Sequence, residues 1–246
     1  MNKHFSLTAY GAHWAGCNRL MAILAASVTL FAASAWADDS VPPSAPLIVA
    51  FGDSLTAGYG LGPGEAFPNQ LEDILRENGY SGAVVKHAGV SGDTSAGGRS
   101  RLTWNLSALP RKPDLLILEL GANDALRGIL PERTRANIDA MLNTLAQKGI
   151  PVLLAGMLAP PNLGDEYGAE FNSLYPDLAQ AYDVPLYPFF LEGVAADASV
   201  NQADGIHPTK EGIAIIARNI LPHVVAALNG VPLAQAAAPH LQSGTP

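Results

Sequence analysis

From residue 47 onward, short apolar runs alternate with stretches in which apolar residues recur at helical spacing. The apolar runs predict five strands, at residues 47–51, 83–87, 115–120, 152–155 and 184–187. The remaining stretches predict helices at residues 67–78, 94–106, 134–147, 170–182 and 209–228. Strands that are separated by helices pair in parallel, and such a sheet needs helices on both of its faces. We therefore expect an α/β fold of three layers, with a five-stranded parallel sheet in the middle.

Two prolines fall inside predicted helices. Pro176 lies in the fourth helix and Pro222 in the last one. Proline lacks the backbone N–H that a helix needs, and its ring collides with the preceding turn. We therefore expect a kink or a break at Pro176 and a kink at Pro222.

The first 37 residues have a different composition from the rest. Lys3 and Arg19 are their only charged residues, and residues 20–31 form an apolar run. Ala35-Trp36-Ala37 offers the small residues that a signal peptidase reads. We predict that residues 1–37 are a cleaved secretory signal, which implies a periplasmic or secreted bacterial protein without a stable membrane span. An uncleaved anchor is the alternative, because the apolar run reaches about the shortest length for a span.

The rest of the chain reads as one domain, at residues 47–228, after a short linker at residues 38–46. Residues 229–246 are rich in Ala, Pro, Gln, Ser and Gly, which predicts a loose tail. The only cysteine, Cys17, lies in the predicted signal, so the exported protein would contain no disulfide. Asp and Glu number 22 against 14 Lys and Arg. An acidic chain repels phosphate backbones, so we expect no nucleic-acid partner. We expect a monomer.

A serine follows the first predicted strand, in Gly52-Asp53-Ser54-Leu55. A serine hydroxyl becomes a nucleophile when a base takes its proton, and a histidine oriented by a carboxylate is such a base. His207 and Asp204 offer this pair in Asp204-Gly205-Ile206-His207, near the other end of the domain. Both motifs have ordinary alternatives, because Gly-Asp-Ser also forms turns and helix caps and Asp-x-x-His is common by chance.

Other chemistry at this serine is less well supported. Gly58 and Gly60 follow Ser54 as in a phosphate-binding loop, but no Gly-Lys-Ser or Gly-Lys-Thr ending is present. The chain contains no Gly-x-Ser-x-Gly, which argues against the nucleophile elbow of the α/β-hydrolase fold. The scattered histidines and acids form no metal-ligand pattern. We expect no metal and no other cofactor.

Four residues should gather at one rim of the sheet. Ser54, Gly92, Asn123 and Met157 each follow a predicted strand, and ligands bind at the carboxyl ends of parallel strands. Acyl transfer needs N–H donors for the negative charge that develops on the carbonyl oxygen. Gly92 could offer its backbone N–H and Asn123 its side-chain amide. The alternatives are a plain turn glycine and a helix cap.

Together these motifs resemble those of the GDSL, or SGNH, hydrolase family. The letters of the second name correspond, in order and with fitting spacing, to Ser54, Gly92, Asn123 and His207. The similarity covers roughly residues 47–226. It extends to the branch of bacterial periplasmic thioesterase I, lysophospholipase L1 and arylesterase, with supporting stretches at residues 52–60, 91–95, 118–128, 184–190 and 204–208. His87 and Ala122 replace the usual asparagine and glycine, and neither change removes a catalytic group.

This resemblance implies the flavodoxin-like SGNH hydrolase fold and the hydrolysis of acyl esters through an acyl-enzyme. The implied substrates are aryl esters, lysophospholipids and acyl thioesters. The implied triad is Ser54, His207 and Asp204, and the implied oxyanion hole uses the N–H groups of Ser54 and Gly92 and the amide of Asn123. Several rim-loop residues are expected to line an acyl groove, although ordinary loop packing accounts for them equally well: Leu126, Ile129, Leu130, Leu158 and Pro160.

Two other functions are compatible with the same residues. A carbohydrate O-deacetylase would use the same triad beside a polar groove. A periplasmic binding module would use the same fold without turnover, but it would not need the serine, the histidine and both oxyanion donors together.

Overall fold

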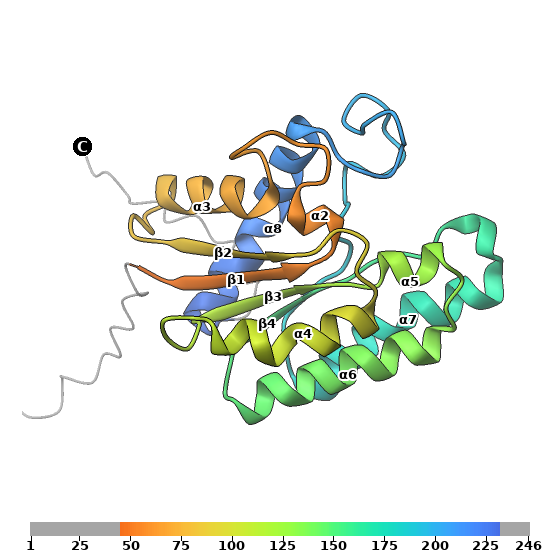
Figure 1. The fold of residues 1–246 in the computed structure, drawn as a ribbon, viewed down its shortest axis with the longest axis horizontal. Coiled ribbons are helices and arrows are strands. Elements are labelled where there is room, and N and C mark those ends of the chain that lie inside the picture. Colours follow the sequence, from red (N-terminus) through yellow and green to blue (C-terminus); the bar gives the residue numbers. More distant parts are fainter. Residues whose placement is uncertain (1–44, 232–246) are drawn as a thin grey trace, which may run out of the picture. The chain divides into compact units, whose positions relative to one another are not determined.

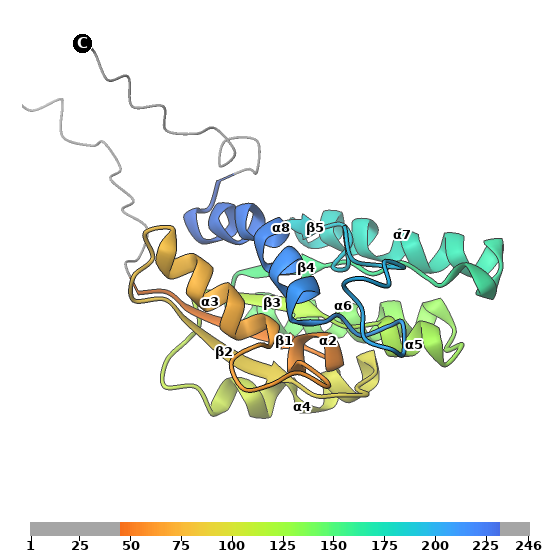
Figure 2. The ribbon, with the colours of Figure 1, turned by 90° about the horizontal axis from the view of Figure 1, so that it is seen from above.

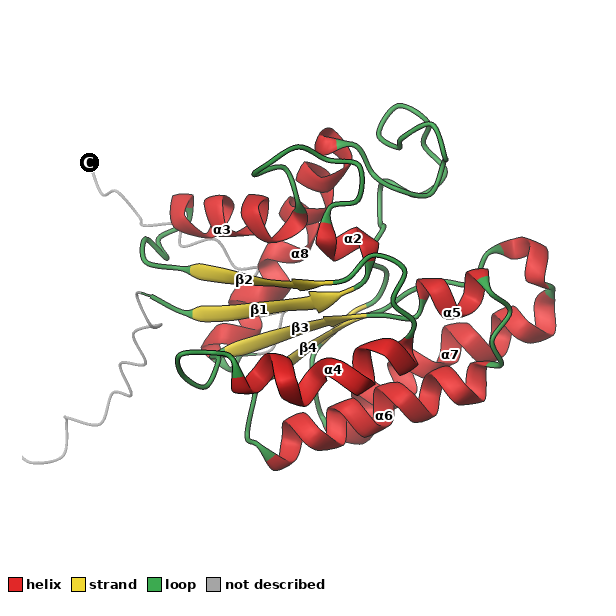
Figure 3. Ribbon diagram, in the orientation of Figure 1, coloured by secondary structure: helices red, strands yellow, loops and turns green. Residues whose placement is uncertain are grey.

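The computed structural model describes residues 45–231 and contains a five-stranded parallel sheet. Its strands are β1 (Leu47–Gly52), β2 (Val84–Gly89), β3 (Leu115–Glu119), β4 (Val152–Ala155) and β5 (Leu186–Tyr187). Their order across the sheet is β2-β1-β3-β4-β5, and every neighbouring pair is parallel. Figure 3 shows β2, β1, β3 and β4 side by side in this order. This order is that of flavodoxin-like doubly wound sheets, so the predicted fold class is confirmed.

Helices cover both faces of the sheet (Figure 1). On one face, α3 (Phe67–Glu77) packs against α8 (Lys210–Asn229), and Figure 2 shows both lying over the strands. On the other face, α6 (Pro131–Gln147) contacts both α4 (Ser95–Ser107) and α7 (Asp165–Tyr182). Three short elements complete the described part of the chain: α2 (Ser54–Ala57), α5 (Ala122–Leu126) and the 3-10 turn η1 (Pro161–Leu163).

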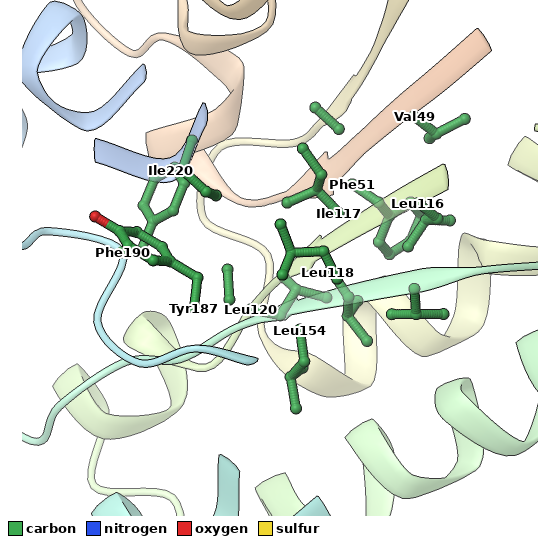
Figure 4. Close-up of a cluster of buried hydrophobic side chains, with 14 of the residues drawn as sticks. Val49, Phe51, Leu116, Ile117, Leu118, Leu120, Leu154, Tyr187, Phe190 and Ile220 are labelled. Atoms are coloured by element: carbon green, nitrogen blue, oxygen red, sulfur yellow. The ribbon is translucent and has the colours of Figure 1, made fainter. Parts of the chain in front are cut away.

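The central strands are buried along their whole length, because helices cover them on both sides. Leu118 of β3 lies in register with Phe51 of β1 on one side and with Leu154 of β4 on the other. Figure 4 shows these side chains in one cluster, to which α8 contributes Ile220. The short apolar runs of the sequence are therefore the centre of the core.

Two helices begin earlier than the sequence predicts. α6 begins at Pro131 instead of residue 134, and α7 begins at Asp165 instead of residue 170. Proline is favourable at the first helical position, because the N–H that it lacks has no helical partner there. Acidic residues in the first turn of α7 complement the positive end of the helix dipole. Apolar periodicity misses both starts because these turns are mostly polar.

Neither internal proline breaks its helix. α7 continues through Pro176, and α8 continues through Pro222. The predicted break at Pro176 is therefore wrong. Tyr175 and Leu178 on either side of it are buried in the core, and this packing offsets the missing backbone hydrogen bond. The predicted kinks remain predictions.

The predicted signal at residues 1–37, nearly all of the linker and residues 232–246 of the predicted tail lie outside the described residues. The last helix of the described residues, α8, ends at Asn229, one residue beyond the end predicted for this helix. Within residues 45–231, α8 alone is long and apolar enough to cross a membrane by length and composition. In this fold α8 packs against α3, β4 and β5.

We predict that Leu145→Ala lowers the free energy of unfolding by about 2–5 kcal/mol. Leu145 lies on α6 and is fully buried, so alanine would leave a cavity. Trp104→Ala is the matched control, because Trp104 on α4 is 71% exposed and its loss should cost less than about 0.5 kcal/mol. Urea unfolding followed by circular dichroism measures both. Equal losses would contradict the described packing of α6.

Candidate active site

Ser54 is the first residue of α2 and follows β1 after a single intervening residue. That residue, Asp53, caps the helix, because its Oδ1 accepts the backbone N–H of Leu55 at 3.0 Å. The turn is tight: the side chains of Thr56 and Glu119 fill the space where Gly52 would carry a Cβ. The strand end and the cap therefore bring Ser54, which is 8% exposed, to the rim of the sheet.

His207 lies in the loop before α8, and this loop is held by its own hydrogen bonds. The backbone N–H groups of Ile206 and His207 both donate to Asp204 Oδ1 at 3.0 Å. Gly205 has a φ of 74°, a conformation that favours glycine. The motif read from the sequence therefore forms a local turn that brings Asp204 beside His207.

The three predicted catalytic side chains form one chain of hydrogen bonds. His207 Nδ1 lies 2.7 Å from Asp204 Oδ2, and His207 Nε2 lies 2.9 Å from Ser54 Oγ. An ionised carboxylate only accepts, so this partner assigns the proton to Nδ1 and leaves Nε2 free to accept from the serine hydroxyl. Residues from opposite ends of the domain thus have the geometry that proton transfer from Ser54 to His207 requires.

The carboxylate of Asp204 is stabilised in its ionised form. The hydrogen bond with His207 lowers the pKa of Asp204 to about 2, and the backbone N–H groups of Ile206 and His207 add to the effect. Because the folded-state pKa lies below its usual value of 3.8, this contribution to stability is present above that value and is lost as the pH falls towards 2. Asp204 is therefore charged at neutral and moderately acidic pH.

Two residues that the sequence did not reveal support His207. Gln202 closes the loop, since its backbone N–H donates to the His207 carbonyl at 2.7 Å. Its side-chain amide donates to the carbonyl of Tyr59 at 2.7 Å, and this bond joins the loop to the segment after α2. The ring centroids of Tyr59 and of the His207 imidazole lie 4.5 Å apart. The two contacts of Tyr59, with Gln202 and with His207, connect segments that are far apart in the sequence.

Asn123 lies in the first turn of α5, which begins after two residues that follow β3, and lines the same cavity as Ser54 and His207. The next residue, Asp124, fixes this short helix. Its carboxylate accepts the backbone N–H of Ser95 at 2.7 Å and the hydroxyl of Thr134 at 3.1 Å. These bonds join α5 to both α4 and α6, so Asn123 stands on a rigid support.

Gly92 lies in the loop after β2 and does not line this cavity. Its φ of 82° explains why glycine suits the position. Its carbonyl accepts a hydrogen bond from Arg127 Nη2 at 2.8 Å, which ties the loop to the end of α5. The structure thus joins the loop that carries Gly92 to the helix that carries Asn123.

The cavity has a volume of about 470 Å³ and mostly apolar walls. Of the predicted groove residues, Leu126, Leu158 and Pro160 line it. Ile129 and Leu130 do not: they line separate hollows, and the Ile129 carbonyl accepts the Tyr167 hydroxyl at 2.7 Å. Sequence reasoning missed further apolar walls, which include Phe189, Leu191, Ala195 and Ile206.

Within residues 45–231, no group of three or more His, Cys, Asp or Glu side chains could hold a metal ion. The polar groups at the cavity suit proton transfer and hydrogen bonding to a substrate oxygen.

The sequence profile described as "GDSL-like Lipase/Acylhydrolase family" matches residues 50–215. The chain is 38% identical over 179 residues to "Esterase TesA" of Pseudomonas aeruginosa, an alignment that covers 73% of this chain and 88% of that protein. It is 37% identical over 174 residues to "Thioesterase 1/protease 1/lysophospholipase L1" of Escherichia coli K12, with 71% and 81% covered.

A solved structure is similar as well. The crystal structure of AlinE4, an SGNH-hydrolase family esterase, matches with a TM-score of 0.64 and 48% sequence identity, and covers 75% of this chain and 97% of that chain. The fold, the profile match and these relatives confirm the resemblance that the motifs indicated. The chain therefore belongs to the GDSL-like lipase/acylhydrolase family.

Proposed function

We propose that this chain is a carboxylic ester hydrolase in which Ser54 is the nucleophile, His207 the base and Asp204 the residue that orients the base. The observation that carries this proposal is the 2.9 Å contact between Ser54 Oγ and His207 Nε2. The other ring nitrogen, His207 Nδ1, lies 2.7 Å from Asp204 Oδ2. The names of the relatives support it, because they are two esterases and a protein named both thioesterase and lysophospholipase.

The reaction takes place in two halves. First, Ser54 Oγ attacks the carbonyl carbon of the ester and its proton passes to His207 Nε2. The bond to the leaving group then breaks, and His207 gives the proton to the departing alcohol or thiol. In the second half, water gives a proton to His207 and attacks the acyl-enzyme. The acid is released, and the proton returns to Ser54.

The negative charge that forms on the carbonyl oxygen needs donors that are already in position. In this proposal the donors are the backbone N–H groups of Ser54 and Gly92 and the side-chain amide of Asn123. The support of α5 by Asp124 and the link from Arg127 to the Gly92 loop favour such a preorganised site.

The apolar cavity favours an acyl chain as the part of the substrate that binds beside Ser54. Each buried methylene contributes roughly 0.8 kcal/mol, so a groove with leucine and proline walls selects fatty acyl groups over acetylated sugars. Aryl esters, lysophospholipids and acyl thioesters all present such a group. We therefore favour these substrates over the carbohydrate O-deacetylase alternative, and the complete hydrogen-bonded triad disfavours a binding module without turnover.

Export to the periplasm or the medium is part of the same proposal. It rests on the composition of residues 1–37, with their apolar run and the small residues before Asp38. Coenzyme A thioesters are scarce outside the cytoplasm, which makes acyl esters and lysophospholipids the better candidates for an exported enzyme.

We predict that Ser54→Ala lowers kcat on p-nitrophenyl esters by several orders of magnitude, on the order of 10⁴-fold or more, without loss of the fold. The variant has no nucleophile, although the cavity remains. Ser81→Ala is the matched control, because Ser81 is exposed and lies before β2. It is therefore near the amino ends of the strands, whereas the site lies at their carboxyl ends. Initial rates on acyl chains from two to sixteen carbons, with circular dichroism, give the comparison. An unchanged rate in a clean Ser54→Ala preparation would refute the assignment.

We predict that Asp204→Asn lowers kcat by about 10³–10⁴-fold while the protein stays folded. An asparagine no longer requires the proton of His207 to sit on Nδ1, so the imidazole loses the tautomer that accepts from Ser54. Asp177→Asn, on the exposed surface of α7, should leave kcat unchanged. A loss of less than about tenfold in Asp204→Asn would show that another group orients His207.

We predict that Leu158→Asn lowers kcat/KM for an octanoyl ester by about tenfold more than for an acetyl ester. Leu158 lines the cavity, and an amide there removes apolar contact only from chains long enough to reach it. Leu130→Asn is the control, because Leu130 is similarly exposed but lines a separate hollow. Equal losses on both esters would place the acyl chain elsewhere.

A further inference from the structure

Two acidic side chains are buried behind Ser54, and the proposed mechanism uses neither of them. Asp53 is fully buried, and Glu119 at the end of β3 is 1% exposed. Burying a carboxyl group is costly unless hydrogen bonds compensate it. Their contacts therefore indicate what the two acids do.

Asp53 is bound to the proposed oxyanion donor. Asn123 Nδ2 donates to Asp53 Oδ2 at 3.0 Å. A primary amide is planar and carries two N–H groups on one nitrogen, so fixing one N–H also fixes the direction of the other. An acceptor at this position also excludes the flipped amide, which would turn an oxygen instead of a nitrogen towards the acceptor. The contact thus determines which atom of Asn123 faces the reacting oxygen.

Asp53 is in turn held at two points. Its Oδ1 accepts the backbone N–H of Leu55 at 3.0 Å, and its own backbone N–H donates to Glu119 Oε2 at 3.2 Å. Glu119 Oε2 also accepts the hydroxyl of Thr56 at 2.8 Å. Glu119 therefore links the end of β3 to Asp53 and Thr56, the residues on either side of Ser54 and Leu55.

Two adjacent buried acids do not both carry a charge at neutral pH. Burial raises the pKa of Asp53 to about 6, and burial next to Asp53 raises the pKa of Glu119 well above its usual 4.5. The pKa of Glu119 is raised further than that of Asp53, and Glu119 Oε1 has no hydrogen-bond partner among the described residues, so the single charge resides on Asp53 and Glu119 is neutral. The other titratable groups that face the pair are His207 and Asp93, which act on Asp53, and Tyr175, which faces Glu119.

We propose that Asp53 is a positioning residue of the oxyanion hole, which holds the amide of Asn123 with an N–H towards the reacting carbonyl oxygen, and that Glu119 holds Asp53 in place. This inference rests on the proposed function.

A double-mutant cycle between Asp53 and Asn123 tests the inference. Asp53→Asn preserves the helix cap, since an asparagine oxygen still accepts from Leu55, but it turns an N–H group against Asn123. We expect Asp53→Asn to lower kcat on p-nitrophenyl butyrate by about 10- to 100-fold, with KM changed less than about threefold. Asn123→Ala should lower kcat by about 10²- to 10³-fold, and the double variant should be no slower than Asn123→Ala within about threefold.

Multiplicative losses in the double variant, or a loss in Asp53→Asn that appears in KM, would overturn the inference. Asp53→Ser, which also caps the helix but cannot reach Asn123, should behave like Asp53→Asn. If Asp53→Asn and Asp53→Ser both failed to fold, the role of Asp53 would be structural and the inference would be wrong. If wild type shows no Ser54-dependent turnover, the proposed function fails first, so the two failures are distinguishable.

Glu119→Gln tests the second part of the inference. Glutamine keeps an acceptor for Asp53 and Thr56, so kcat should fall less than threefold, whereas Glu119→Leu should lower it more than tenfold. A raised folded-state pKa means that wild type loses stability as the pH rises above about 4.5. The midpoint of thermal unfolding of Glu119→Gln should therefore rise relative to wild type between pH 5 and pH 8. Equal kcat losses in Glu119→Gln and Glu119→Leu, or a flat difference in the midpoint, would show that Glu119 does not act as a neutral acceptor.

Discussion

The contact between Glu119 and the backbone of Asp53 joins the ends of β3 and β1, and the rest of the site depends on it. The two strands are already in register, with Phe51 opposite Leu118, so the residues that follow them leave the sheet side by side. A Cβ at Gly52 would collide with the side chains of Glu119 and Thr56, so glycine at this position leaves room for the contact of Glu119. The pairing of the two strands brings the turn that carries Ser54 and the helix that carries Asn123 to one cavity.

The remaining parts of the site are attached to this pair of strand ends by separate hydrogen bonds. Asp124 joins α5 to α4 and α6, and Gln202 joins the histidine loop to the segment after α2. Each bond connects elements that are distant in the chain, so the catalytic groups are ordered without a substrate. Such preorganisation is what stabilisation of a developing charge requires, because donors that must first reorient lose part of their effect.

Buried acids are costly for a fold, and here the cost lies next to the proposed chemistry. Glu119 and Asp53 are compensated by backbone N–H groups, the Thr56 hydroxyl and the Asn123 amide, while Glu119 Oε1 is buried without a hydrogen-bond partner among the described residues. Burying such groups costs free energy wherever hydrogen bonds do not compensate it. The structure nevertheless has a polar connection here, from the centre of the sheet to the proposed oxyanion donor.

The sequence by itself determined the architecture and the local motifs. Strands covered on both faces leave continuous apolar runs, and the turn from Asp204 to His207 is built from bonds within four residues, so both can be read directly. Only the tertiary structure decided that α7 continues through Pro176, that Ile129 lies outside the cavity, and that Phe189 and Ile206 line it. It also decided the contacts of Glu119, Asp53 and Gln202. The physical reason is the same in each case: these features depend on packing and hydrogen bonds between segments far apart in the chain, and local residue patterns carry no record of such contacts.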